Sequence, residues 1–106
     1  MNILLIGAAG RLGAERVREF ERRGHRLTES APAGALEHAR TSAPDVIVLD
    51  TGGVSDWRKD APDLAAEPVT RDVPILVLHL GRDRPAAQLI ALVERVGGAA
   101  RSAALL

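Results

Sequence analysis

A glycine-rich turn follows the first apolar run of the chain. Gly7, Gly10 and Gly13 stand at G-x-x-G-x-x-G spacing within the stretch ILLIGAAGRLGAERV. Glycines in such a turn let the backbone approach a phosphate group, and free N–H groups at the start of the next helix can hold the anion. Arg11 would add positive charge beside it. The alternative is that the three glycines only make a tight turn between a strand and a helix.

Two polar residues end later apolar runs. Asp50 closes the run VIVLD, and His79 follows the run ILVL. These runs and the N-terminal run ILLI are nearly continuous in Ile, Leu and Val, which is typical of parallel strands covered on both faces. Because the carboxyl ends of parallel strands meet at one edge of a sheet, we expect Gly7, Asp50 and His79 to converge there.

Helices are expected between these strands. Three stretches have apolar residues at helical spacing: Leu12 to Arg23, Pro32 to Thr41 and Pro85 to Val96. Gly24 suits the end of the first helix, Ser30 could cap the second, and Gly97-Gly98 should end the third.

Three further elements are expected. A weaker strand should run from His25 to Thr28, a loop with a short helix from Val54 to Ala66, and a short fifth strand from Ala100. Alternation of strands and helices predicts right-handed βαβ units. The expected fold is a single α/β domain over residues 1–106, a doubly wound, flavodoxin-like parallel sheet of strand order 2-1-3-4-5 with a short or missing last helix.

Composition excludes several classes of protein. The 106 residues suit one domain, and 14 Lys+Arg balance 14 Asp+Glu, which argues against a nucleic-acid or polybasic membrane binder. The lack of Cys excludes disulfides, thiolate catalysis and Cys-ligated zinc. The N-terminal apolar run is too short for a signal peptide or a membrane span, so we expect a soluble, cytoplasmic protein.

Two segments resemble response-regulator receiver domains. SAPDVIVLDTGG is similar to the third receiver strand, and EPVTRDVPILVLHLG is similar to the connection into the fourth. The resemblance spans nearly the whole chain. It implies a receiver-like fold, a phosphoacceptor position at Asp50, and two-component or phosphorelay signalling through contact with a kinase, an effector or a second copy of the chain.

The chain departs from the receiver pattern where the chemistry is done. Phosphoryl transfer to a carboxylate needs a divalent cation, and in receivers an acidic pair after the first strand supplies most of the ligands of Mg²⁺. Residues 6–8 are Ile-Gly-Ala here, His79 replaces the usual hydroxyl residue, and residues 103–105 are apolar where a lysine is usual. These departures predict a pseudo-receiver that is non-catalytic or weakly phosphorylatable and has no cofactor or metal.

Asp50 and His79 each have two interpretations. Asp50 is either a phosphoacceptor or switch residue, or an aspartate that braces the turn after its strand. His79 is either a hydrogen-bonded structural residue or the partner of Asp50 in a pH-sensitive contact.

The first thirty residues also resemble the first βαβ unit of short-chain dehydrogenases and related NAD(P)-binding proteins. This resemblance implies a phosphate-binding turn at Gly7 to Gly13, Arg11 at a 2′-phosphate and Glu29 at a ribose hydroxyl. The chain has no Tyr, which excludes the Tyr-Lys catalytic pair of those enzymes. The alternative to a receiver-like module is therefore a small, non-enzymatic dinucleotide- or nucleotide-binding module.

Overall fold

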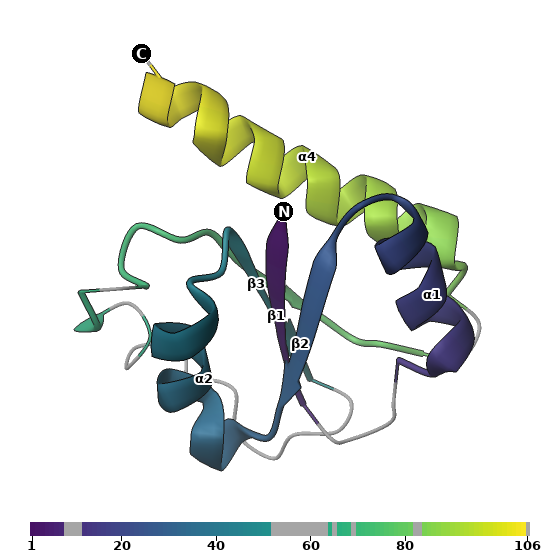
Figure 1. The fold of residues 1–106 in the computed structure, drawn as a ribbon, viewed down its shortest axis with the longest axis horizontal. Coiled ribbons are helices and arrows are strands. Elements are labelled where there is room, and N and C mark those ends of the chain that lie inside the picture. The colour runs from purple at the N-terminus through teal and green to yellow at the C-terminus, as the bar shows by residue number, and fades with distance from the viewer. Residues whose placement is uncertain (8–11, 52–63, 65, 69, 82–83, 106) are drawn as a thin grey trace.

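The computed structural model describes residues 1–7, 12–51, 64, 66–68, 70–81 and 84–105. Its elements, drawn in Figure 1, are β1 (Asn2–Ile6), α1 (Ala14–Arg22), β2 (Arg26–Ser30), the 3₁₀ turn η1 (Pro32–Gly34), α2 (Ala35–Ser42), β3 (Val46–Asp50), β4 (Ile75–Leu78) and α4 (Ala86–Leu105). Most of the stretch from Val54 to Ala66, where a loop and short helix are predicted, lies outside the described residues.

The four strands form one parallel sheet of order β2-β1-β3-β4. This confirms the predicted α/β class and the predicted order of the first four strands. All five residues of β3 are buried, as its unbroken apolar run predicts. The sheet places the carboxyl ends of β1, β3 and β4 next to one another, because Ile6 pairs with Leu49 and Asp50 pairs with Leu78.

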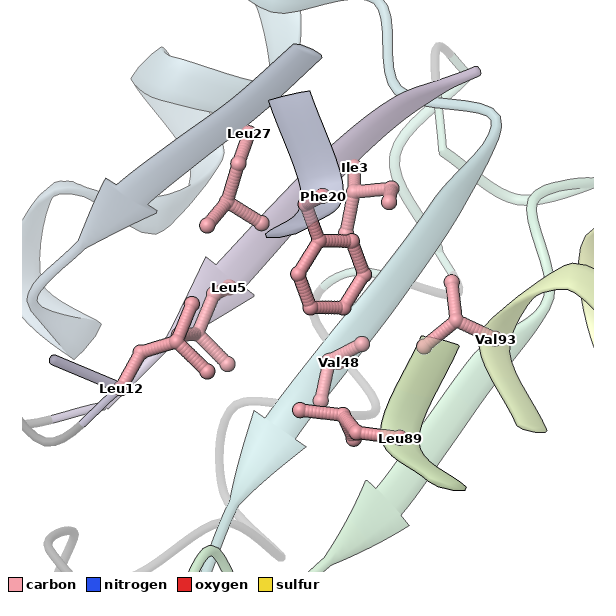
Figure 2. A pocket seen from close by; sticks show the side chains of 8 residues that line it. All are labelled: Ile3, Leu5, Leu12, Phe20, Leu27, Val48, Leu89 and Val93. Carbon is pink, nitrogen blue, oxygen red and sulfur yellow. The ribbon is translucent and has the colours of Figure 1, made fainter. Parts of the chain in front are cut away.

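Helices cover both faces of the sheet, with α1 and α2 on opposite sides in Figure 1. One apolar layer joins β1 and β3 to α1 and α4 and contains Phe20, Leu89 and Val93. The other joins the opposite side chains of β1 and β3 to α2, through Ala35 and Ala39. Figure 2 shows eight side chains of the first layer converging around a small apolar void from three strands, two helices and, for Leu12, the segment before α1.

The end of α1 confirms the predicted role of Gly24. Its φ of 84° lies in the left-handed region that favours glycine. The Gly24 N–H donates to Glu21 O at 2.9 Å, and the His25 N–H donates to Phe20 O at 3.0 Å. These two bonds form a Schellman motif, which turns the chain from α1 into β2.

Two predictions about the C-terminal part of the chain are wrong. Helix α4 does not stop at Gly97-Gly98 but continues to Leu105, so the residues from Ala100 are helical and no fifth strand joins the described sheet. A Cβ on Gly97 would meet the end of the flexible Met1 side chain, which would have to shift to make room for it. Glycine lowers helix stability by only about 1 kcal/mol, and α4 tolerates it.

The prediction that Ser30 caps α2 is wrong. Its hydroxyl donates to the Ala31 carbonyl at 2.8 Å and contacts His38 Nδ1 at 2.8 Å. The chain enters α2 through η1 instead. Pro32 lies in the first turn of η1, which has no side-chain cap. Ser30 therefore fastens α2 through a side-chain contact with His38 rather than through a backbone N–H.

Candidate functional site

Three strand ends converge, as predicted. Gly7 follows β1, Asp50 ends β3, and Leu80 follows β4. A Cβ built on Gly7 would lie 3.0 Å from Asp50 Cβ, and the Leu80 N–H donates to Asp50 Oδ1 at 3.0 Å. The side chain of Asp50 therefore stands at the centre of this edge, between the ends of β1 and β4.

Asp50 is buried, with only 1% of its surface exposed. A buried carboxylate is unfavourable unless hydrogen-bond donors meet it, and the backbone N–H of Leu80 is such a donor. The neighbouring Thr51 N–H donates to Leu78 O at 2.9 Å. Together these bonds fasten the segment after β4 to the end of β3, which is the bracing role considered for Asp50.

Gly7 has a packing reason to be glycine. Besides its approach to Asp50 Cβ, a side chain there would come within 3.4 Å of Asp50 Oδ2. The Gly7 N–H donates to Ser30 O at 2.9 Å, so it continues the pairing between β1 and β2. This amide is therefore engaged within the protein rather than directed at a phosphate.

The rest of the glycine motif is only partly described. Gly10 and Arg11 lie outside the described residues. Gly13 precedes α1 with a φ of 83°, a left-handed conformation that explains glycine there without a ligand. Glu29, the expected partner of a ribose hydroxyl, is exposed on β2.

His79 is not in contact with Asp50. Successive residues of a strand point to opposite faces, and the side chains of Leu78 and Leu80 are buried while those of Val77 and His79 are exposed. Among the hydrogen bonds of the described residues, none joins His79 to Asp50. The structure thus brings the backbone of Leu80, instead of the His79 side chain, to this carboxylate.

Arg16 is a further residue near this edge that the sequence does not single out. Its guanidinium is partly buried and donates to Leu12 O at 2.6 Å, to Gly81 O at 2.9 Å and to Arg84 O at 3.3 Å. Arg16 therefore ties α1 to the loop that carries Leu80. Its two partners beyond α1 lie 65 and 68 residues away along the chain, so no local pattern reveals the contact.

The described part of this edge does not form a site for a divalent cation. In the part of the chain that the structure describes, no three His, Asp or Glu side chains lie close enough to hold a metal together. Asp50 is the carboxylate beside Gly7, and Gly7 has no side-chain ligand to add. Magnesium takes oxygen ligands in octahedral geometry and is usually held by one or two carboxylates, and Asp50 and Gly7 supply a single carboxylate between them.

Among the described residues, no helix combines the length and the apolar character needed to cross a bilayer.

Three solved structures are similar to this chain over most of their length. The receiver domain of a sensor histidine kinase from Pseudomonas aeruginosa, solved with a magnesium ion in its active-site cleft, matches with a TM-score of 0.75 and 21% identity over 92% of this chain and 97% of its own. A response regulator from Desulfuromonas acetoxidans matches with a TM-score of 0.74 and 15% identity over 90% and 94%.

The N-terminal domain of a response regulator receiver protein from Methanoculleus marisnigri matches with a TM-score of 0.63 and 21% identity over 90% of this chain and 94% of that one. No protein-family model matches the chain, and no curated protein matches it in sequence. At these identities the likeness concerns the fold. The chain therefore has a receiver-like α/β fold with a parallel sheet of order 2-1-3-4.

Proposed function

We propose that this chain is a receiver-like signalling module that acts through protein–protein contacts and does not accept a phosphoryl group at Asp50. The observation that carries the proposal is the packing of Gly7 against Asp50. A Cβ added to Gly7 would lie only 3.0 Å from Asp50 Cβ. A glycine in this place supplies no carboxylate to hold a cation beside Asp50.

The physical argument concerns charge. A phosphoryl group on a buried aspartate adds negative charge that needs a cation or several donors to neutralise it. The Pseudomonas receiver domain holds magnesium in its active-site cleft. Here the described edge offers one carboxylate, and Leu80 N–H already bonds it at 3.0 Å. These features support a bracing role for Asp50.

A nucleotide-binding module is the alternative, and NAD(P) would be its cofactor. The engagement of the Gly7 N–H by Ser30 O argues against it. The proposed function predicts no small-molecule ligand and the alternative predicts a dinucleotide, so one experiment separates them.

The test is a thermal melting series with the purified protein in buffer, in Mg²⁺ with beryllofluoride, and in NAD⁺, NADP⁺ or ATP. A ligand that binds the native state raises the melting midpoint by mass action. We expect no rise with any of these ligands. A rise with Mg²⁺ and beryllofluoride that disappears in Asp50→Asn would overturn the proposal, and a rise with the dinucleotides would favour the alternative.

A further inference from the structure

The outer edge of β4 has unused backbone groups. In a parallel pair, alternate residues of a strand direct their N–H and C=O groups to the same neighbour. Ile47 N–H donates to Pro74 O and Thr51 N–H donates to Leu78 O, so the even-numbered residues of β4 face β3. Ile75 and Val77 therefore direct their N–H and C=O groups outward, away from the sheet. No hydrogen bond within the described residues uses these outward groups.

The side chains of this edge are apolar. β4 reads Ile-Leu-Val-Leu, and Val77 is a large apolar residue with 39% of its surface exposed. Natural edge strands are usually protected by charge, by proline, by a bulge or by being very short, as the four-residue β4 is. β4 has no charged residue between Ile75 and Leu78. The outward N–H and C=O groups of β4 can therefore form hydrogen bonds with another strand.

We propose that β4 pairs in antiparallel fashion with β4 of a second copy of this chain, about a two-fold axis that passes beside Leu76. In this register Ile75 lies opposite Val77 of the second copy, and the two Leu76 residues lie opposite each other. The two four-stranded sheets then become one continuous sheet. The interface is closed by its symmetry, which limits the assembly to a dimer.

This register uses the outward N–H and C=O groups of both Ile75 and Val77. In an antiparallel pair, residues that face each other directly can exchange two hydrogen bonds. Ile75 exchanges two hydrogen bonds with Val77 of the second copy. The symmetry-related pair, Val77 with Ile75 of the second copy, exchanges two more. A register shifted by one residue would place outward groups opposite inward ones, and the bonds would be lost.

The side chains also favour a second copy as the occupant. The two-fold axis is perpendicular to the sheet, so Ile75 and Val77 of one copy lie beside Val77 and Ile75 of the other on the same face. Cross-strand pairs of β-branched residues are among those that stabilise sheets. Ile75 packs against the apolar layer under α2, so the pairing extends that layer across the interface.

The charges that flank β4 are compatible with this arrangement. The side chain of Asp72, just before β4, is 93% exposed and lies 3.7 Å from the Arg71 guanidinium, and His79, just after β4, is exposed. Antiparallel pairing brings the end that carries Asp72 toward the end of the second copy that carries His79. An acidic group thus approaches an imidazole, with no two carboxylates brought together.

Amide hydrogen exchange, measured residue by residue from low micromolar to millimolar protein, tests the proposal directly. A four-residue strand gives a small interface, so we expect a weak dimer in sedimentation experiments. Exchange at Ile75 and Val77 should slow as the dimer fills. Leu76 and Leu78, whose N–H groups face β3, should be protected at every concentration.

A charge on the edge should weaken the dimer. Val77→Lys places an ammonium on an exposed side chain, and we expect its Kd to rise at least about tenfold. Glu29→Gln is the matched control, because it changes the net charge by the same one unit on the opposite edge, and it should leave Kd unchanged. If Val77→Lys does not fold, the exchange pattern of the unaltered chain decides alone.

Two results would overturn the proposal. One is a monomer at all concentrations, and the other is a dimer in which the Ile75 and Val77 amides still exchange at the unprotected rate. Self-pairing through β4 is independent of whether Asp50 accepts a phosphoryl group, so the melting series and this experiment can fail separately.

Discussion

β2 and β4 form the two edges of the same parallel sheet, yet their residues differ in kind. β2 reads Arg-Leu-Thr-Glu-Ser and exposes Arg26 and Glu29. β4 reads Ile-Leu-Val-Leu and exposes Val77. Because exposed charges oppose the docking of another strand, the comparison indicates that β2 is a protected edge and β4 an open one.

The two edges also differ in how side chains fasten them. At the carboxyl end of β2 a backbone bond, from Gly7 N–H to Ser30 O, joins the strand to the rest of the sheet. The chain before and after β4 is held by backbone bonds as well, from Ile47 N–H to Pro74 O and from Thr51 N–H to Leu78 O, and side chains add to these bonds. Asp50 and Arg16 hold the chain after β4, and an ion pair between Arg40 and Glu67 holds the chain before it. These three contacts decrease in burial, and their expected effects decrease in the same order.

Asp50→Ala should have the largest effect. It removes a charged acceptor and leaves the N–H of Leu80, itself 2% exposed, without this bond. The expected loss in the free energy of unfolding is about 2–3 kcal/mol, measured by urea denaturation. Asp50→Asn keeps an oxygen acceptor and should lose less. Equal losses in the two variants would contradict the bracing role.

Arg16→Ala should have an intermediate effect, because three backbone carbonyls lose a charged donor. The expected loss in the free energy of unfolding is about 1–2 kcal/mol, reduced by the access of water to this half-buried position. Arg18→Ala is the control, since Arg18 is exposed on the same helix, and it should change the free energy by less than about 0.5 kcal/mol. Similar losses in both would show that Arg16 does not fasten the loop.

Glu67→Gln should have the smallest effect, confined to neutral pH. The bonds from Arg40, at 2.7 and 3.1 Å, lower the pKa of Glu67. A lowered pKa in the folded state means that the ion pair stabilises the protein above the unfolded pKa and stops doing so as pH falls through the folded value. Melting midpoints should therefore differ slightly at about pH 7 and coincide at about pH 2. A difference that persists in acid would contradict this assignment.

Much of the fold follows from local pattern. Unbroken apolar runs predict buried parallel strands, and the convergence of Gly7 with Asp50 follows from that topology. Gly24 is recognisable because a helix end uses its positive φ. Gly97 has the same residue type but lies inside α4, beside the end of the Met1 side chain, and only the tertiary structure distinguishes the two glycines.

The site was less predictable because its contacts involve the backbone. The sequence draws attention to the side chain of His79, whereas the group that reaches Asp50 is the N–H of the next residue, Leu80. Arg16 has the spacing of a solvated charge and bonds carbonyls that are distant in sequence. Neither contact can be recognised from residue type or from the periodicity of the sequence.

The most direct test of the central claim, that Asp50 braces the segment after β4 and does not accept a phosphoryl group, is the amide spectrum of the ¹⁵N-labelled protein during titration with Mg²⁺ and beryllofluoride. Leu80 reports on the bond itself, and Thr51 reports on the adjoining turn. We predict that both amide signals stay unchanged. A saturable shift of Leu80 and Thr51 that is abolished in Asp50→Asn would contradict the claim.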